Sequence, residues 1–363
     1  MKKIVLLSII CLLLIWPTLG LAHEEAKTTY FKGTEFLRRL ELDSAITELT
    51  KAINILVGLT SRTADETDML ADAFNNRGLA YREKGNYNLA LQDLAWAYNL
   101  GKTKPKILSN YALVLYEMAE TYPSYYGLAA YIYELAIEWS TGDEAHLVDI
   151  YNNLGVCYAN QSTPDQAKAE AAYKKAIDLN TTKGLDYTDA YYNLANLYYN
   201  QGKALNDQGK KTQALVKYDL AIQNYDITIS FYEGSKKVES ATAVDNLADS
   251  YYNRGLCKYD QGKYNEAIPD FEKVLEVRPG DSWAHYAKGY SHFMLNDYDK
   301  AVPEFETILG SEIDAYARYG LGVVYCKQDN MEKGLNFLNQ SCDAGNQTAC
   351  QALSGSGDAL KGL

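Results

Sequence analysis

The sequence is poor in histidine, proline and basic residues. Its 363 residues include 4 histidines and 7 prolines, and 35 lysines and arginines stand against 47 aspartates and glutamates, giving a net charge of −12. An anionic chain without basic clusters is a poor partner for nucleic acid or acidic lipid. No proline-rich, low-complexity or charged tract divides the chain. The composition therefore argues against nucleic-acid binding and predicts no linker between separate domains.

Catalytic and metal-binding motifs are also missing. The sequence contains no H-E-x-x-H, G-x-S-x-G, phosphate-binding loop or dinucleotide fingerprint. Its many carboxylates form no distinctive pair for acid-base chemistry. His285 and His292 are seven residues apart and share a helix face, where we expect them to replace core aromatic side chains. The sequence thus predicts a protein that is not an enzyme and needs no metal or cofactor.

The N-terminus has the features of a cleavable export signal. Lys2 and Lys3 precede an apolar run, residues 4–16, and small residues up to Ala22 suit signal-peptidase cleavage. The run is shorter than the roughly twenty apolar residues that span a bilayer, which disfavours the alternative of a retained anchor. Removal of residues 1–22 would leave 341 residues without a membrane span and take the net charge from −12 to −14. The short lysine-bearing leader is typical of bacteria, so we expect a periplasmic or secreted protein.

The remaining chain repeats one helical pattern about eight times. The sequence N-N-L-G-V-C-Y at residues 152–158 recurs with variation, and each copy precedes a small-x3-large-x2-small cluster such as Ala90, Leu94 and Ala97. A small anchor residue in the first helix marks each unit: Gly33, Gly78, Ala112, Gly155, Ala195, Gly255, Gly289 and Gly322. Small residues at these places let two helices approach closely. Such an array predicts a solenoid in which each hairpin contacts its neighbours.

This pattern resembles the tetratricopeptide repeat, a helix-turn-helix of about 34 residues. The match is best in residues 72–104 and 251–314, where the run from Gly262 to Ala267 and the later Pro279 follow the family pattern. The resemblance covers residues 23–340. It implies an all-α fold, a right-handed α-α superhelix of about eight helical hairpins. It also implies a non-enzymatic adaptor that binds proteins or peptides.

Some units are longer than the family length. The longest spacing separates the anchors Ala195 and Gly255. Residues 202–209 are expected to lengthen the first hairpin and residues 223–246 the second helix, because both stretches keep a helical composition. Residues 341–363 are expected to form a C-terminal cap with a frayed end.

Five cysteines remain after removal of the leader, an odd number for an oxidising compartment. Cys342 and Cys350 are eight residues apart, and Gly345 between them favours a turn that would bring the sulfurs together. This tail resembles the cysteine-bearing Sel1-like repeat, which implies a disulfide at that spacing. Cys157 and Cys257 each follow an anchor by two residues, so we expect buried, unreactive thiols.

One narrow stripe of the first helices is expected to face away from the core, at about 100° per residue. Five successive units carry asparagine two residues before the anchor: Asn76, Asn110, Asn153, Asn193 and Asn253. Four of them carry aspartate six residues before it: Asp72, Asp149, Asp189 and Asp249. Asparagine is a mediocre helix former, but its amide both donates and accepts, as binding to a peptide backbone requires. In the resembled family, similar asparagine ladders on the concave face bind extended peptides. An ordinary solvated polar face is the alternative.

Aromatic residues flank this stripe. They are Tyr192, Tyr252, Tyr286, Tyr319, Tyr116, Tyr199, Tyr259 and Phe293. Tyrosine combines contact area with a polar tip, so Tyr199 and Tyr259 are predicted to contact a peptide, although such rings also pack between units. Aspartate stands where a carboxylate clamp would need lysine, which favours basic or neutral ligands. The predicted function is an adaptor with an acidic, tyrosine-rich groove. A structural assembly subunit of an envelope complex or a homo-oligomer is the alternative, and the oligomeric state stays open.

Overall fold

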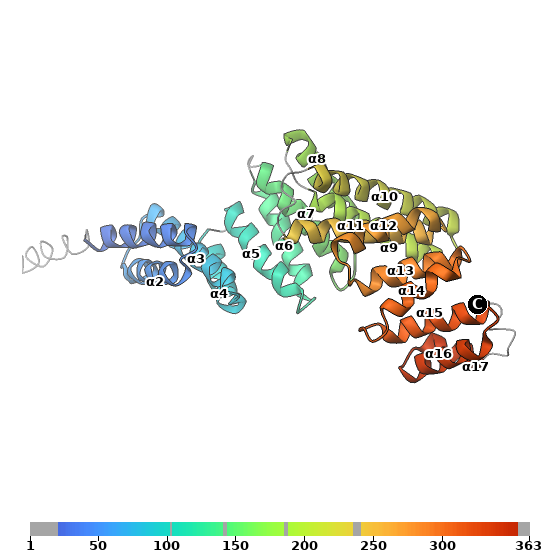
Figure 1. Cartoon of the computed structure of the whole chain (residues 1–363). Helices are drawn as coiled ribbons and strands as arrows, with labels where there is room; N and C mark the ends of the chain where they lie inside the picture. The colour runs from blue at the N-terminus through green and yellow to red at the C-terminus, as the bar shows by residue number, and fades with distance from the viewer. Residues whose placement is uncertain (1–20, 102–103, 141–143, 185–187, 235–240, 355–363) are drawn as a thin grey trace, which may run out of the picture. The chain divides into compact units, whose positions relative to one another are not determined.

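The computed structural model describes residues 21–101, 104–140, 144–184, 188–234 and 241–354. Within these ranges all regular secondary structure is helical (Figure 1). This confirms the predicted all-α class built from helical hairpins. The chain forms two compact units, residues 1–185 (unit 1) and 186–363 (unit 2). Of the predicted leader, residues 1–20 lie outside the described ranges, and residues 21 and 22 belong to a helical stretch, 21–38.

Unit 1 contains four hairpins in its described part. The helical stretch 21–38 pairs with α2, and the later hairpins are α3–α4, α5–α6 and α7–α8. The helices are α2 (Leu42–Gly58), α3 (Ala64–Glu83), α4 (Tyr87–Leu100), α5 (Pro105–Ala119), α6 (Tyr125–Glu138), α7 (Glu144–Asn160) and α8 (Gln166–Lys183).

Unit 2 contains four further hairpins and one short terminal helix in its described part. The hairpins are α9–α10, α11–α12, α13–α14 and α15–α16, and α17 packs against α16. The helices are α9 (Asp189–Asp207), α10 (Lys211–Gly234), α11 (Ala241–Asp260), α12 (Tyr264–Val277), α13 (Ser282–Met294), α14 (Tyr298–Thr307), α15 (Asp314–Lys327), α16 (Met331–Asp343) and α17 (Gln347–Ser354). The eight hairpins agree with the predicted number.

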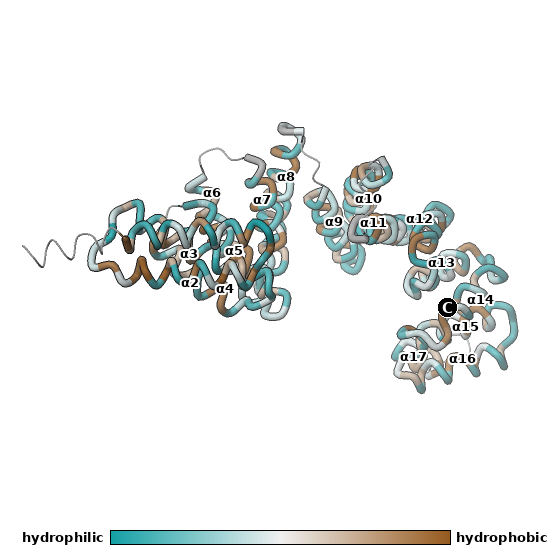
Figure 2. Tube along the Cα trace, turned by 60° about the vertical axis from the view of Figure 1, so that its left-hand side comes forward, coloured by the Kyte–Doolittle hydropathy of each residue, from teal (hydrophilic) through white to brown (hydrophobic). Residues whose placement is uncertain are grey.

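The hairpins close because small anchor residues let the two helices touch. A Cβ atom built on Gly155 would lie 2.5 Å from the ring of Tyr173, and one on Gly255 would lie 2.7 Å from the ring of Phe271. Hydrophobic and hydrophilic residues alternate along each helix (Figure 2), and the large residue of each second helix is buried, as Phe271 is at 0% exposure. These contacts confirm the close approach that the small residues predict.

The turn inside most hairpins lies seven residues after the anchor and has a left-handed backbone. The residues with positive φ at this place are Leu40, Gly85, Gly262, Asn296 and Asp329. In the hairpin of α9 and α10 the corresponding turn residue is Gly209, seven residues after Gly202, and Gly202 faces Tyr218. The repeat pattern places Tyr218 in the unit of the anchor Ala195, but its ring packs over Gly202 instead. The close approach occurs two helical turns later because both helices are elongated.

The elongation itself is as expected at residues 202–209, where α9 runs to Asp207. The expectation that residues 223–246 all belong to the second helix is wrong in part. Helix α10 ends at Gly234, and residues 241–246 are the start of α11.

In its described part, each unit has a hairpin with an arginine–aspartate pair between its two helices. In unit 1, Arg77 donates from Nε and Nη2 to the two carboxylate oxygens of Asp93, both at 2.7 Å. In unit 2, Arg254 makes the same two bonds to Asp270 at 3.0 and 2.5 Å, and Lys258 adds a third at 2.7 Å. Asp93 and Asp270 are 4% and 2% exposed. These bidentate pairs fix the register of the two helices.

Residues 341–354 contain a tight turn between α16 and α17, and the expected frayed end at residues 355–363 lies outside the described ranges. Gly345 adopts a left-handed backbone at φ 92°, and Asn346 Oδ1 accepts from the backbone N–H groups of Thr348 and Ala349, which starts α17. The Sγ atoms of Cys342 and Cys350 lie 1.95 Å apart. The cap boundary expected at residue 341 falls inside α16.

The two thiols expected to be buried are buried. Cys157 and Cys257 are both 0% exposed. Burial raises the pKa of Cys157 to about 12 and also raises that of Cys257. Both thiols are therefore protonated at neutral pH and are poor nucleophiles.

Candidate functional site

The first helices of both units present cavities at the same positions relative to the anchors. Side chains six and three residues before an anchor, and one and four after it, line these cavities. This is the helix face on which the sequence predicts the asparagine stripe and its tyrosine flank. We therefore take this first-helix face as the candidate site and describe it in each unit separately.

The predicted asparagines hydrogen-bond mainly to neighbouring repeats. In unit 1, Asn76 donates to Thr34 Oγ1 at 3.1 Å, Asn110 to Asn75 Oδ1 at 2.8 Å and Asn153 to the Tyr133 hydroxyl at 3.3 Å. In unit 2, Asn253 donates to the Tyr192 hydroxyl at 3.2 Å. Asn193 is half-buried on α9. These bonds couple adjacent repeats and use part of each amide, which carries two N–H donors and a carbonyl acceptor.

The predicted aspartates differ in exposure. Asp149 and Asp189 are exposed on α7 and α9. Asp249 is half-buried and accepts from Arg278 Nη1 at 2.7 Å, while Arg278 also bonds Asp245 at 2.8 Å. The acidity near Asp249 is therefore partly neutralised by one arginine.

Unit 2 holds a cavity of about 440 Å³ with aromatic walls, which we call the aromatic cavity. Six aromatic side chains from three successive first helices line it: Tyr252, Tyr259, Trp283, Tyr286, Tyr290 and Tyr319. Among the described residues that line it, none carries a charge. Trp283 is 43% exposed and forms its open edge, whereas the tyrosines are half-buried. Of the predicted site residues, Tyr259 lies here.

The rings of the aromatic cavity contact one another in tilted and edge-to-face arrangements. The centroids of Tyr286 and Tyr290 are 4.7 Å apart, and that of Trp283 is 5.9 Å from Tyr286. Burial raises the pKa of Tyr286 to about 12, and burial together with the nearby Asp281 carboxylate raises the pKa of Tyr252 to about 12. The phenols are therefore neutral hydroxyls at physiological pH, and the cavity offers π-faces and hydroxyl groups to a ligand.

Sequence reasoning selected Tyr259 but missed Trp283 and Tyr290. Trp283 stands six residues before its anchor, where earlier units have aspartate, and Tyr290 stands one residue after it. If the α13 sequence had been read for the positions that share a helix face with Tyr286, rather than for a repeated asparagine, both side chains would have been placed beside Tyr286.

Tyr199 belongs to a separate buried cluster. Its ring contacts Tyr218 at 6.0 Å between centroids, and its hydroxyl interacts with the carboxylate of Asp260. Burial raises the pKa of Asp260, although Tyr199 and Lys203 favour its charged form. The Oδ2 atom of Asp260 is buried without a hydrogen-bond partner among the described residues.

Unit 1 presents a polar cavity of about 350 Å³ at the corresponding register, which we call the polar cavity. Its walls carry amide, charged and hydroxyl groups, including those of Tyr30, Thr34, Arg38, Asp72, Asn76 and Lys106. Of the predicted site residues, Asn76 lies here, 8% exposed. Asp72 of the predicted aspartates also lies here, and the other predicted asparagines and aspartates line neither of these two cavities.

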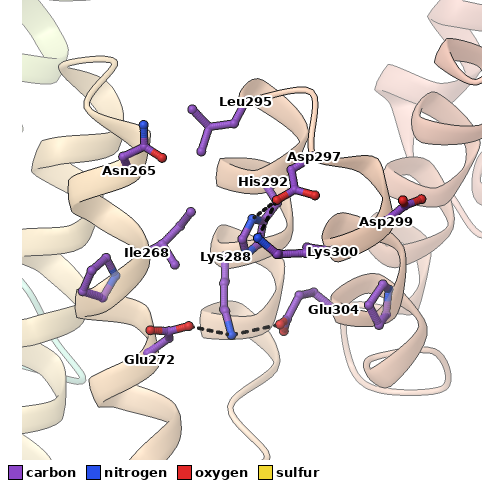
Figure 3. A pocket seen from close by; sticks show the side chains of 12 residues that line it. Asn265, Ile268, Glu272, Lys288, His292, Leu295, Asp297, Asp299, Lys300 and Glu304 are labelled. Carbon is purple, nitrogen blue, oxygen red and sulfur yellow. Dashed lines mark ion pairs between the residues drawn. The ribbon is translucent and has the colours of Figure 1, made fainter.

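A third cavity of about 460 Å³ lies between α12, α13 and α14 (Figure 3). Lys288 projects into it from α13 and contacts Glu272 of α12 at 3.2 Å and Glu304 of α14 at 3.0 Å. Lys300 pairs with Asp297 at 2.8 Å. On α13, Lys288 lies roughly opposite Tyr286, so this charged cavity and the aromatic cavity occupy different faces of one helix.

The two histidines on α13 do not both replace core aromatics. His292 is 7% exposed, but it lines the charged cavity. His285 interacts through Nδ1 with Glu304 at 2.6 Å and through Nε2 with the Pro279 carbonyl at 3.1 Å. The expectation fails for His285 because its ring nitrogens find polar partners at the helix surface.

In the described part of the chain no three side chains of histidine, cysteine, aspartate or glutamate are grouped closely enough to hold a metal ion. A search of the described helices for one with the length and apolar character to cross a bilayer found none.

Two segments of the chain match a known family of repeats. Residues 148–183 and residues 248–281 each match the family model of the tetratricopeptide repeat. No curated protein matched the sequence. The two matched segments contain α7 with α8 and most of the hairpin of α11 and α12.

Solved structures resemble the chain in fold. The C-terminal part of a TPR repeat-containing protein from Cytophaga hutchinsonii is 18% identical, with a TM-score of 0.53 over 77% of this chain and 98% of that one. The apo form of RapI is 12% identical, with a TM-score of 0.54 over 88% and 87%. YrrB, described as a TPR protein with an unusual peptide-binding site, is 20% identical, with a TM-score of 0.40 over 59% and 98%. The first two similarities concern the fold, and together with the family matches they support a tetratricopeptide-repeat protein.

Proposed function

We propose that this chain is a non-enzymatic scaffold that binds an extended segment of a partner protein along the first-helix face. Tetratricopeptide-repeat proteins typically serve as protein-interaction scaffolds. The observation that carries the proposal is the aromatic cavity, because six rings from α11, α13 and α15 converge on one open space of about 440 Å³. Tyrosine and tryptophan supply large contact areas at low entropic cost, as peptide-binding surfaces need.

In this proposal the asparagines have two roles. The Asn253 amide nitrogen joins α11 to the preceding first helix by donating to the Tyr192 hydroxyl and to Asn196 Oδ1, and its carbonyl remains able to accept from a peptide backbone. Asn110 in unit 1 likewise keeps its carbonyl, whereas Asn153 keeps one N–H, because its Oδ1 accepts from Asn152 at 3.3 Å. The exposed carboxylates of Asp149 and Asp189 favour a partner segment with basic or neutral side chains.

Export is part of the proposal. The leader at residues 1–22 and the adjacent sulfurs of Cys342 and Cys350 both suit a periplasmic or secreted protein with an oxidised tail. The tail's resemblance to the Sel1-like repeat belongs to the same proposal. N-terminal sequencing of protein from the native host, together with thiol counting, tests these points directly.

The experiment is selection of displayed random peptides on the purified chain. The parent is expected to enrich a common peptide sequence, and the double variant Tyr259→Ala with Trp283→Ala is expected to lose it. Trp96→Ala is the matched control, because Trp96 is 60% exposed on a second helix. Enrichment of the same peptides by the parent and the double variant would contradict binding at the aromatic cavity.

A second function, assembly with other subunits, is favoured by the exposed hydrophobic side chains of the second helices. Trp96 on α4, Tyr131 on α6 and Trp139 at its end are 60%, 54% and 46% exposed. Sedimentation of the chain over a range of concentrations separates the two functions. Defined oligomers that dissociate in Trp96→Ala, but not in Trp283→Ala, would favour assembly.

A further inference from the structure

The aromatic cavity has the geometry of a cage for a cation. Trp283, Tyr286 and Tyr290 form one continuous wall with centroids 4.7 to 5.9 Å apart, and Tyr252, Tyr259 and Tyr319 complete the lining. Aromatic faces carry negative electrostatic potential and attract guanidinium and ammonium groups within about 6 Å of a ring centroid. No lysine or arginine is among the described lining residues, so the rings have no cation of their own.

The charged residues around the aromatic cavity are mainly acidic. Asp281 lies near Tyr252, and Asp260 lies near Tyr259. Asp249 and Asp245 both bond Arg278, which lies 3.9 Å from Asp281, and Lys203 lies near Asp260. These four carboxylates outnumber the two basic groups around rings whose hydroxyls stay neutral, which favours a positive ligand.

The hydroxyl of Tyr290 is inaccessible to solvent and makes no hydrogen bond of good geometry within the described residues, with the Tyr286 hydroxyl as its polar neighbour. A ligand in the cavity therefore meets ring faces rather than this oxygen. A guanidinium group suits such a surface because its plane stacks on aromatic rings.

We propose that the aromatic cavity binds the guanidinium group of an arginine side chain in the partner segment. Arginine fits better than lysine because its planar group is more weakly hydrated and stacks on aromatic rings. The exposed face of Trp283 and the neighbouring ring of Tyr316, 5.7 Å away and 46% exposed, extend the surface for the aliphatic part of the side chain. This inference rests on the proposed function, since it names the side chain that the groove selects.

The charged cavity between α12 and α14 provides an internal contrast. Lys288 and Lys300 line it, and each already pairs with a carboxylate, Lys288 with Glu272 and Glu304 and Lys300 with Asp297. An incoming cation would meet two ammonium groups there. Variants of this cavity therefore serve as controls on the opposite face of α13.

The test is calorimetric titration of the full chain with four peptides, Ac-Gly-Gly-Xaa-Gly-Gly-NH2, where Xaa is arginine, lysine, citrulline or norleucine. Citrulline keeps the shape of arginine without its charge, and norleucine is apolar. We expect the arginine peptide to bind about tenfold more tightly than the citrulline and norleucine peptides, and more tightly than the lysine peptide. Added salt should weaken binding of the arginine peptide more than binding of the neutral peptides.

Three variants accompany the parent. Trp283→Leu removes an exposed cage ring and should abolish the preference for arginine over citrulline. Asp281→Asn keeps an acceptor for the cap bond to Ala284 N–H while removing a charge, and should reduce arginine binding about twofold. Glu272→Gln in the charged cavity, with a side chain that is 51% exposed, should leave all four affinities unchanged. Circular dichroism establishes that each variant is folded.

The outcomes separate the two proposals. Equal or tighter binding of the neutral peptides would overturn the arginine inference while leaving peptide binding at the groove intact. Equal or tighter binding of the lysine peptide would overturn the assignment to guanidinium. Binding of none of the four peptides, in a chain that enriches no displayed peptide either, would overturn both proposals.

Discussion

The first-helix faces of the two units share one register and differ in chemistry. Three residues before their anchors, unit 1 has Tyr30 and Asn75 where unit 2 has Tyr252, Tyr286 and Tyr319. The same backbone positions thus line the polar cavity in one unit and the aromatic cavity in the other. The repeat determines where a cavity forms, and the side chains at a few positions determine what it binds.

The polar cavity also contrasts with the aromatic cavity in its internal bonding. Asn76 in its wall donates to Thr34 and accepts from Asn75, so its amide takes part in the packing of neighbouring repeats. The rings of the aromatic cavity contact each other without comparable hydrogen bonds. The aromatic cavity therefore keeps more of its binding surface available, which is why we assign the ligand-binding role to unit 2.

The largest expected effect is the loss of stability when the buried arginine–aspartate pair of either unit is broken. Asp93→Ala and Asp270→Ala each leave a partly buried arginine without its bidentate carboxylate, which destabilises by about 3–5 kcal/mol. We expect the larger loss in unit 2, because Asp270 also bonds Lys258. Urea denaturation followed by circular dichroism measures both free energies of unfolding.

Asp226→Ala is the control for this comparison. Asp226 bonds Arg254 at 2.6 Å, but its side chain is 51% exposed, so its loss should cost less than about 1 kcal/mol. Equal losses of unfolding free energy for Asp226→Ala and Asp270→Ala would contradict the assignment of the buried Arg254–Asp270 pair as the main polar contact between α11 and α12.

Tyrosine-to-phenylalanine substitutions compare a satisfied hydroxyl in unit 1 with an unsatisfied one in unit 2. Tyr133→Phe removes the acceptor of the Asn153 amide and should lower the free energy of unfolding by about 1 kcal/mol. Tyr290→Phe removes a buried hydroxyl without a good partner and should raise it or leave it unchanged. Thermal unfolding measures both. A loss from Tyr290→Phe as large as that from Tyr133→Phe would mean that the Tyr290 hydroxyl is bonded in solution.

A smaller expected effect is the pH dependence of stability that a buried carboxylate produces in unit 2. Burial raises the pKa of Asp260 in unit 2, so the folded state binds this proton more tightly than the unfolded state and loses stability as pH rises through the folded pKa. Asp260→Asn should therefore stabilise the protein at neutral pH, and the gain should shrink toward the ordinary pKa of about 3.9. Unfolding measured across this range tests the sign.

Glu83 in unit 1, at the same register and 44% exposed, is the control for that measurement. Glu83→Gln should change stability by less than about 1 kcal/mol, because an exposed ion pair contributes little. A pH-independent gain from Asp260→Asn would contradict desolvation as its cause.

The repeat pattern predicted the fold well because its determinants are local. A small anchor and a large residue in the second helix define most hairpins, as the contact of Gly155 with Tyr173 illustrates. The binding surface was harder to predict because it depends on contacts between repeats. The amide of Asn253 and the hydroxyl of Tyr192 are 61 residues apart in sequence, and the spacing within one helix does not indicate that they bond.

The smallest expected effect concerns the turns inside the hairpins. Leu40 in unit 1 has φ 59° and is 69% exposed, whereas unit 2 has Asn296 with the same φ at the equivalent place. Left-handed backbone is unfavourable for leucine and better tolerated by asparagine. Leu40→Asn should therefore raise the free energy of unfolding by about 0.5 kcal/mol, and Asn296→Leu should lower it by a similar amount. Opposite shifts of the urea midpoints of the two variants would show that the same backbone preference acts at this turn in both units. A loss from Leu40→Asn would instead mean that the leucine side chain stabilises unit 1 through contacts that outweigh the strain of its backbone.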